Sequence, residues 1–407
     1  MKYISFLVFF IMLTSCKQEY QYKNQIKNDV VFLADDKLEG RQTGTKGEKE
    51  AAKYIAERFK EIGLQPKGTD AFYQTFNFKP KTEPHGEVSY SINAEDSTIT
   101  GTNVLGFIDN QAENTIIIGA HFDHLGHGSE GSLHKGAKEI HNGADDNASG
   151  VAVMLDLAGK LKKENTSNNY LFMAFSGEEM GLLGSNYFTK NATLDLKNAN
   201  YMINMDMVGR LKQDSTLAVY GVGTSPRWKQ TLSATNPGFK LVESESGVGP
   251  SDHTSFYLVD IPVLHFFTGQ HEDYHKPGDD SEKLNYEGMD AISNYLFDII
   301  SELDNDGKLA FRKTKNESEE TPRFKVGLGV VPDYLFDGEG MRIDGISEDK
   351  PAQKAGLQKG DIVIKLGEIE VIDMKTYMLG LSEFNKGDVT KVVVDRKGTE
   401  VEAEIKF

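Results

Sequence analysis

The segment spanning residues 115–150 constrains the fold of this chain more than any other. An apolar run at 115–118 leads directly to His121 and Asp123, and a polar loop then ends in two aspartates, the second of which is Asp146. Histidine and carboxylate side chains placed where a buried strand ends are typical of a metal site in an α/β enzyme. The segment therefore predicts a metal site at the edge of a sheet.

Strand-like and helix-like patterns alternate through residues 29–303, which predicts an α/β fold. The fold class that we expect is a mostly parallel or mixed central sheet flanked by helices, because alternating elements build βαβ units. The expected strands are 115–119, 170–175, 201–205, 217–220 and 261–267, and the expected helices are 48–62, closed by Gly63, 149–161 and 288–303.

The C-terminal part of the chain predicts a linker and a second domain. Residues 304–323 are polar and charged and read as an interdomain linker. Residues 324–407, with short strands and Gly-rich turns, predict a small α+β domain.

The N-terminus carries a predicted targeting signal. An apolar run at 4–13 is too short to span a bilayer and has the make-up of a secretory signal. Leu-Thr-Ser-Cys, ending in Cys16, resembles the lipobox of bacterial lipoproteins, which implies that residues 1–15 are removed, Cys16 is lipidated and 16–28 form a tether. An ordinary signal peptide is the alternative. The expected location is the bacterial cell envelope, with a membrane partner through the lipid.

Acidity excludes one class of partner. The formal net charge of the chain is −17, whereas a nucleic-acid phosphate backbone needs a basic protein face. We therefore expect no nucleic-acid partner.

Potential metal ligands follow the predicted strands. A catalytic zinc needs three protein ligands and a water. The chain offers five candidate ligands, more than one such zinc would use. One carboxylate bridging two metals, with two ligands for each metal, would use the whole set, and metals about 3.5–4 Å apart hold a hydroxide and polarise a carbonyl. The candidate ligands are His121, Asp146, Glu179, Asp206 and His275.

The adjacent pair Glu178 and Glu179 follows a run that must be buried. Successive residues in a turn point in different directions, so one carboxylate binds metal while the other faces the substrate. A free carboxylate beside activated water is a suitable general base. Gly177 before the pair allows close approach of the backbone.

At this point the sequence resembles the di-zinc exopeptidases, the family of secreted bacterial aminopeptidases and glutamate carboxypeptidases. The resemblance covers residues 29–303 and rests on GAHFDH, NGADDNASG, FSGEEMGLLGS, NMDMVG and YHKPGDD, in that order. It implies two zinc ions, peptide substrates and a metal-bridging hydroxide that attacks the scissile bond.

The resemblance also implies a role for each matching residue. His121 and Asp206 would bind one zinc, Glu179 and His275 the other, and Asp146 would bridge them. The catalytic roles would fall to Glu178 as general base, Asp123 as the group that orients His121, and Tyr274 as a hydrogen-bond donor to the oxyanion. Asp252, His253 and Arg210 are further candidates for the substrate pocket. The remaining histidines, among them His124 and His271, are interpreted as loop residues.

Residues 324–407 resemble a PDZ domain. The Gly327-Leu328-Gly329 turn would hold the C-terminal carboxylate of a peptide, which would add to the sheet as a strand. A packing or gating element is the alternative role for this domain.

The expected activity is that of a zinc-dependent aminopeptidase. A carboxypeptidase would need a cation for the substrate carboxylate, and Arg210 is the nearest candidate. A glutaminyl cyclase would share the fold but use one zinc. A non-catalytic scaffold that binds peptides remains the alternative from another class.

Overall fold

The computed structural model describes residues 25–80, 89–91, 98–128, 131–163, 167–315, 324–333, 335–336, 338–347 and 349–407. Cys16, the predicted signal at 1–15 and most of the predicted tether at 16–28 lie outside these ranges. Within the described residues, no helix is both long enough and apolar enough to cross a membrane.

The larger of the two sheets has ten strands. Its main path runs β3-β2-β4-β6-β5-β7-β10-β8-β9, and β1 pairs with β4. The strands are β1 (Gln65–Pro66), β2 (Tyr73–Lys79), β3 (Ser89–Ser91), β4 (Ile99–Ile108), β5 (Thr115–His121), β6 (Asn169–Phe175), β7 (Ala199–Met205), β8 (Thr216–Tyr220), β9 (Lys240–Ser244) and β10 (Val263–Phe267).

This sheet is mixed, with parallel strands at its centre. Strands β6, β5, β7 and β10 run parallel to one another, whereas β4 and β8 flank them in antiparallel orientation. The predicted α/β fold class is confirmed. The sequence pattern missed the long strand β4, which is almost entirely buried and carries no alternation to reveal it.

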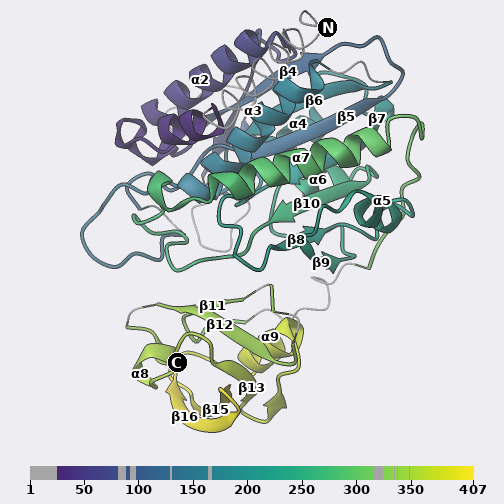
Figure 1. Cartoon of the computed structure of the whole chain (residues 1–407). Helices are drawn as coiled ribbons and strands as arrows, with labels where there is room; N and C mark the ends of the chain where they lie inside the picture. The colour runs from purple at the N-terminus through teal and green to yellow at the C-terminus, as the bar shows by residue number, and fades with distance from the viewer. Residues whose placement is uncertain are drawn as a thin grey trace, which may run out of the picture.

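Helices cover both faces of the large sheet. They are α2 (Lys46–Ile62), α3 (Gly150–Leu161), α4 (Leu183–Lys190), α5 (Trp228–Thr235), α6 (His253–Tyr257) and α7 (Tyr286–Glu302), with short helical turns η1 (Asp36–Arg41), η2 (Ala144–Ser149), η3 (Leu196–Asn198) and η4 (Ser281–Lys283). Helices α3 and α7 cross the same face (Figure 1). Helices α4 and α6 contact each other, and their Phe188 and Phe256 belong to a second core.

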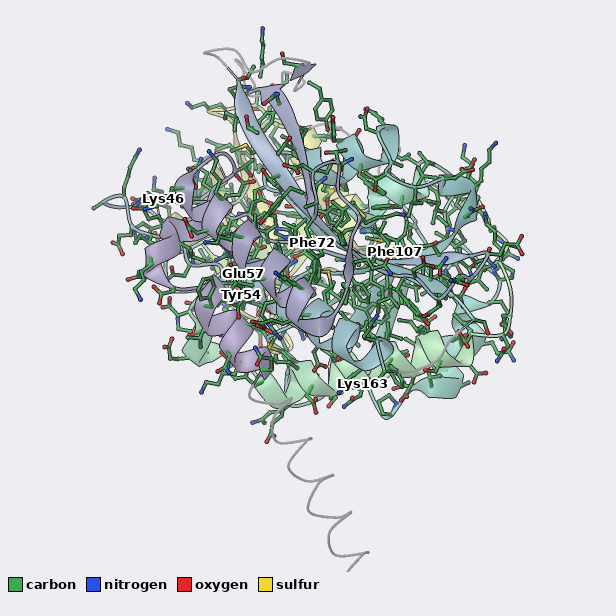
Figure 2. The ribbon with its side chains drawn as sticks, turned by 90° about the horizontal axis from the view of Figure 1, so that it is seen from above. Lys46, Tyr54, Glu57, Phe72, Phe107 and Lys163 are labelled. Carbon is green, nitrogen blue, oxygen red and sulfur yellow. The ribbon has the colours of Figure 1, made fainter. Side chains whose placement is uncertain are left out.

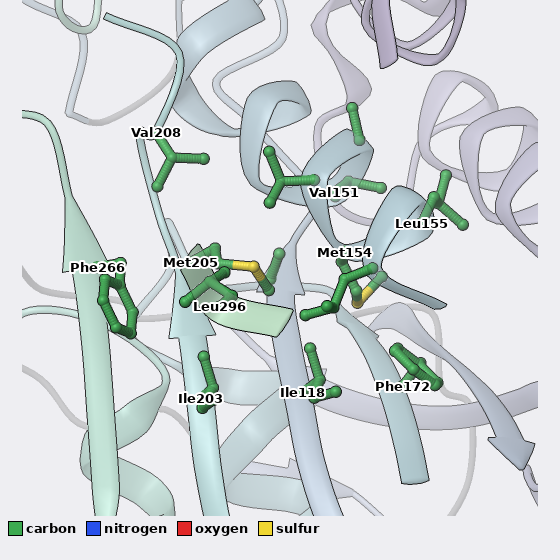
Figure 3. Close-up of a cluster of buried hydrophobic side chains, with 14 of the residues drawn as sticks. Ile118, Val151, Met154, Leu155, Phe172, Ile203, Met205, Val208, Phe266 and Leu296 are labelled. Carbon is green, nitrogen blue, oxygen red and sulfur yellow. The ribbon is translucent and has the colours of Figure 1, made fainter. Parts of the chain in front are cut away.

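Apolar side chains of α3 and the central strands form the main core. Val151 and Met154 of α3 lie over Ile118 of β5 and Ile203 of β7 (Figure 3), and all four are fully buried. A buried aliphatic side chain of this size contributes roughly 1.5–3 kcal/mol. Because the core holds α3 against the strands, it also fixes η2, the turn directly before α3.

Helix α2 forms as the sequence predicts, starting two residues earlier. The Thr45 side chain caps its first turn, and Gly63 ends it with a left-handed φ of 89°, a conformation that glycine adopts without steric cost. Seen from above, Phe72 lies between α2 and the strands (Figure 2), where its ring is 6.3 Å from that of Phe59.

The C-terminal region contains a separate six-stranded sheet with its own core. The sheet follows the order β11-β12-β13-β15-β16, and β14 pairs with β13. Its elements are β11 (Val330–Pro332), β12 (Met341–Ile346), α8 (Pro351–Lys354), β13 (Ile362–Leu366), β14 (Ile369–Glu370), α9 (Met374–Ser382), β15 (Val389–Arg396) and β16 (Thr399–Lys406).

The first part of the predicted linker lies against the large sheet and its helices. Leu309 N donates to the side chain of Asn200 at 2.7 Å, and Arg312 N donates to Thr224 O at 2.7 Å. Thr314 N donates to the hydroxyl of Tyr257 at 3.0 Å. Residues up to 315 are therefore docked, and 316–323 lie outside the described part of the chain.

Candidate metal centre

The parallel strands β5, β6 and β7 place the residues at their carboxyl ends along one edge of the sheet. His121 is the last residue of β5, Glu178 and Glu179 follow β6, and Asp206 follows β7 directly. Between β6 and the two glutamates, Gly177 has a φ of 74°, which turns the chain sharply and sends the glutamates back over the sheet edge. The crevice at the carboxyl ends of parallel strands is where open α/β sheets bind ligands.

One group of possible metal ligands consists of His121, Asp146 and Asp206, whose ligand atoms all lie within 4.8 Å of one another. His121 Nε2 lies 3.3 Å from Asp146 Oδ1 and 3.3 Å from Asp206 Oδ1. His121 is 1% exposed and Asp146 is 3% exposed. The group is therefore almost closed to solvent on the side of the sheet.

A second group forms on the other oxygen of Asp146. His275 Nε2 lies 3.1 Å from Asp146 Oδ2 and 3.4 Å from Glu179 Oε2. His124 Nδ1 lies 2.8 Å from Glu179 Oε1 and 3.9 Å from Asp146 Oδ2. Asp146 thus presents one oxygen to each group, which is the arrangement of a bridging carboxylate.

The sequence interpretation missed His124. It lies three residues after His121, is 1% exposed, and belongs with Asp146 and Glu179 to the second possible metal group. Because β5 ends at His121, the chain turns at once and carries His124 back to the same crevice. Its position within the His121 segment was the only sequence signal for this role.

The spacing of these atoms fits zinc. Two ligand atoms that are each about 2.0–2.1 Å from a tetrahedral zinc lie roughly 3.3 Å apart. The Nε2 atoms of His121 and His275 lie 3.1–3.3 Å from the Asp146 and Asp206 oxygens that face them. Imidazole nitrogen and carboxylate oxygen are also the ligand types that zinc accepts. The residues present therefore fit the metal.

Asp123 links three parts of the site. Its carboxylate accepts hydrogen bonds from Glu178 N at 3.1 Å and from the Thr43 hydroxyl at 3.0 Å. His121 Nδ1 lies 3.2 Å from the Asp123 backbone oxygen and 3.7 Å from its carboxylate. The nearer partner of the His121 ring is therefore the backbone oxygen, and the carboxylate also positions the backbone of Glu178.

The carboxyl group of Glu178 has a pKa raised well above its usual value. Burial raises this pKa, the neighbouring charges of Asp206 and Glu179 raise it further, and His121 lowers it. A bound dication would also lower this pKa. The group is thereby moved away from the permanently ionised state of an exposed glutamate.

A cavity of about 220 Å³ opens onto the metal groups. Four of its lining residues are acidic, and none is lysine or arginine among the residues that the structure describes. Tyr274 is in the wall, with its ring stacked on His275 at 3.8 Å between centroids. The lining residues are Asp146, Glu178, Glu179, Asp206, Met207, Tyr220, Pro250, His265, Phe267, Gln270, Tyr274 and His275.

The three further pocket candidates lie behind this wall. Asp252 and His253 are fully buried, and neither lines the cavity. Burial raises the pKa of Asp252 to about 7 and lowers that of His253 well below its usual value. Arg210 donates to Asp273 Oδ2 at 3.0 Å, and it too is absent from the wall.

Sequence comparison assigns two regions. Residues 103–300 match the family model described as Peptidase family M28. Residues 310–407 match the PDZ domain model, and within them the Gly329 turn has a φ of 76° and its carbonyl accepts from Ser347 N at 2.8 Å.

The M28 region has curated relatives at moderate identity. Aminopeptidase YwaD of Bacillus subtilis is 33% identical over 171 residues, which are 39% of this chain and 37% of that protein. The Escherichia coli alkaline phosphatase isozyme conversion protein is 33% identical over 175 residues, 41% of this chain and 46% of that protein. The matches therefore span less than half the length of these relatives.

Solved structures share the fold. A zinc aminopeptidase from Bacillus subtilis has a TM-score of 0.54 at 20% identity, covering 72% of this chain and 96% of that one. A glutaminyl cyclase from Bacteroides thetaiotaomicron has a TM-score of 0.54 at 17% identity, covering 68% of this chain and 97% of that one. The fold is thus common to both kinds of enzyme.

Proposed function

We propose that this protein is a zinc-dependent aminopeptidase that removes N-terminal residues from peptides. The observation that carries the proposal is the wall of the cavity, where four carboxylates meet histidines and no lysine or arginine is found among the described residues. The two proposed zinc ions would offset the charge of Asp146, Glu179 and Asp206, which leaves Glu178 as the free carboxylate in the wall that attracts a substrate ammonium group. The free amine of a peptide N-terminus has the required charge.

The proposed metal centre would hold two zinc ions. His121 and Asp206 would hold one ion and Glu179 and His275 the other, with Asp146 shared between them; the separations of 3.1–3.4 Å support this assignment. His124 contacts Glu179 and orients its carboxylate. Zinc would supply Lewis-acid polarisation of a carbonyl and activation of water.

The side chains of this protein supply the proton transfer and the positioning. Glu178 accepts the proton of the attacking water and passes it to the leaving amine, a role that suits a carboxylate in the cavity wall that is not assigned to a metal. Asp123 accepts a hydrogen bond from Glu178 N, which keeps the base over the cavity. Tyr274, in the cavity wall, donates a hydrogen bond to the developing oxyanion.

The pairing of Arg210 favours an aminopeptidase over a carboxypeptidase. A carboxypeptidase needs a cation for the terminal carboxylate of its substrate. Arg210, the candidate cation, is 3.0 Å from Asp273 and 3.6 Å from Asp279, and its side chain is 18% exposed. A side chain held by two carboxylates is a poor ligand for a third.

Glutaminyl cyclase is the second candidate, because a solved cyclase shares the fold. Two metal groups around Asp146 favour the peptidase, since the cyclase resemblance implies one zinc. A non-catalytic scaffold would not need a base such as Glu178 beside the metal groups.

A substrate panel with and without a chelator tests the proposed activity. Aminoacyl chromogenic substrates with a free amine should be cleaved, the same compounds with a blocked amine should not, and a zinc chelator should abolish cleavage. Zinc should restore it. Cleavage of amine-blocked substrates, or cyclisation of N-terminal glutamine without peptide hydrolysis, would contradict the proposal.

We further propose a division into a tether at 16–28, a peptidase domain at 29–303, a linker at 304–323 and a PDZ domain at 324–407, although Ile26 is buried in the main core and residues up to 315 pack on the peptidase domain. The PDZ domain would bind a peptide C-terminus through Gly327, Leu328 and Gly329. Its support is the PDZ match and the glycine-rich turn. Binding of a free-acid peptide, but not its C-terminal amide, by the intact protein would test this role.

Membrane attachment through Cys16 is a separate proposal, supported by Leu13-Thr14-Ser15-Cys16 after an apolar run. It places the enzyme in the bacterial cell envelope. Full-length protein expressed in a bacterium should fractionate with membranes, and C16S should not. Recovery of both proteins in the soluble fraction would contradict the anchor.

A further inference from the structure

Arg41 is a fully buried cation that touches the loops of the metal centre. It is 0% exposed and is the last residue of η1, where Glu39, Gly40 and Arg41 all have positive φ. Left-handed backbone costs energy for residues other than glycine. A Cβ atom at Gly40 would lie only 2.5 Å from His141 O. The turn at Gly40 therefore packs directly against the backbone of the loop that contains His141.

The guanidinium of Arg41 donates hydrogen bonds to backbone oxygens on separate segments. Its Nε donates to Phe122 O at 2.7 Å, in the residue between His121 and Asp123. Its terminal nitrogens donate to Asn142 O at 2.6 Å and to Gly143 O at 3.0 Å, in the segment that leads to Asp146. A further bond reaches Leu33 O.

Asp279 accepts hydrogen bonds from the backbone amides of residues 144–146. Its Oδ2 accepts hydrogen bonds from Asp145 N at 2.9 Å and from Asp146 N at 3.0 Å. Its backbone oxygen accepts from Ala144 N at 2.9 Å. Asp279 is 0% exposed and lies four residues after His275, so it ties the Asp146 segment to the His275 segment.

We propose that Arg41 and Asp279 are paired positioning residues that hold the Asp146 segment in register with His121 and His275. Arg41 donates hydrogen bonds to the carbonyl oxygens of this segment, and Asp279 accepts hydrogen bonds from its amides. Together they fix the position and the orientation of the Asp146 backbone. Neither residue touches substrate or metal. This inference rests on the metal centre of the proposed function, and it adds two residues that act on that centre through other groups.

The charges of the pair also suit the site. Arg41 is attracted by the carboxylates of Asp123, Asp146, Asp279 and Glu179. Burying an arginine is unfavourable unless its donors are paired, and here they meet main-chain oxygens in a fixed fork. Lysine would keep the charge but would lose the planar set of donors that reaches several carbonyls at once.

An arginine and an aspartate elsewhere in the same domain offer a matched control. Arg58 Nε donates to Asp29 Oδ1 at 2.8 Å, and Asp29 is 1% exposed. This pair also joins separate segments, the helical stretch at 25–33 and α2, but it touches none of the proposed ligand segments. R58K and D29N should therefore reduce stability without changing the metal centre.

The experiment compares zinc affinity in the full chain of R41K, D279N, R58K and D29N with that of the wild type. Affinity is measured by competition with a chromogenic chelator, and thermal unfolding of each metal-free protein is followed by circular dichroism. We expect R41K and D279N to bind zinc about 10–100-fold more weakly, the usual cost of losing a group that orients metal ligands. The two control variants should bind zinc as the wild type does.

Wild-type zinc affinity in R41K or in D279N would overturn the inference, as would an equal loss of affinity in the controls. D279N keeps the volume of the buried side chain and carries the test if R41K does not fold. Absence of zinc binding by the wild type would overturn both this inference and the proposed function. Normal zinc binding without cleavage of free-amine substrates would overturn the proposed function alone.

Discussion

Nε2 of His275 lies 3.1 Å from Oδ2 of Asp146, although the two residues belong to different loops. The other oxygen of Asp146 faces His121 at 3.3 Å. One carboxylate therefore stands between two imidazoles, and a pair of metals about 3.5–4 Å apart requires such a bridge.

Zinc stoichiometry should depend most on Asp146. Because its two oxygens serve both groups, D146A should lower the zinc content from two ions per chain to less than one, whereas H275A should remove only one. Elemental analysis of dialysed protein measures this content. Equal loss in the two variants would contradict a bridging role for Asp146.

Replacement of Glu178 should abolish turnover without removing zinc. E178Q keeps the shape of the side chain but cannot take up a proton as a carboxylate does, and loss of a general base costs about 10²–10⁴-fold in rate. The measurement is kcat on a free-amine substrate together with zinc content. Near-normal activity in a zinc-loaded E178Q would remove Glu178 from its proposed role.

The first residue of the substrate should be large and apolar rather than acidic. Met207, Tyr220 and Phe267 supply apolar surface to the cavity wall, while the free carboxylate of Glu178 repels a second negative charge. We expect kcat/KM for a leucine substrate to exceed that for a glutamate substrate by at least about tenfold, or roughly 1.4 kcal/mol. A preference for glutamate would show that the side chain binds elsewhere.

Stability should fall with acidification because His265 is buried as a neutral ring. Burial, together with the nearby His121 and against the opposing effect of Asp206, lowers the pKa of His265 to about 4. His253 stacks on it at 4.5 Å. Since the unfolded chain takes up this proton near pH 6.5 and the folded chain only near pH 4, stability present above pH 6.5 is lost between these values as pH falls.

Urea unfolding of the metal-free protein at pH 7 and pH 5 measures this loss. The contribution of His265 at pH 5 should be about 2 kcal/mol, and H265Q should lose correspondingly less stability than the wild type over the same interval. The same pH dependence in wild type and H265Q would contradict the assignment.

Local sequence patterns predicted the elements that carry the site. The apolar run before His121 formed β5, the run before Glu178 formed β6, and Gly63 ended α2 with the expected left-handed backbone. These features depend on neighbours in the sequence, because strand and helix periodicity and terminal glycines act within a few residues. The buried strand β4 had no such periodicity and was missed.

The residues that support the site could not be found in this way. His124 contacts Glu179, Arg41 contacts Asn142, and Asp279 contacts Asp145 and Asp146, each across a long stretch of chain. Their side chains are ordinary histidine, arginine and aspartate until the fold brings them to a partner. Arg210 illustrates the reverse case, because its ion pairs with Asp273 and Asp279 withdraw it from the substrate pocket.

The sequence by itself determined which residues follow the buried strands, and therefore which imidazoles and carboxylates meet at the edge of the sheet. Only the tertiary structure decided that Asp146 stands between two histidines, that His124 joins them, and that the cavity wall carries no arginine or lysine among the described residues. The physical reason is the separation along the sequence over which each interaction acts. Strand ends are set by local burial, whereas ligand geometry and charge pairing depend on distances between atoms that the chain separates and the fold brings together.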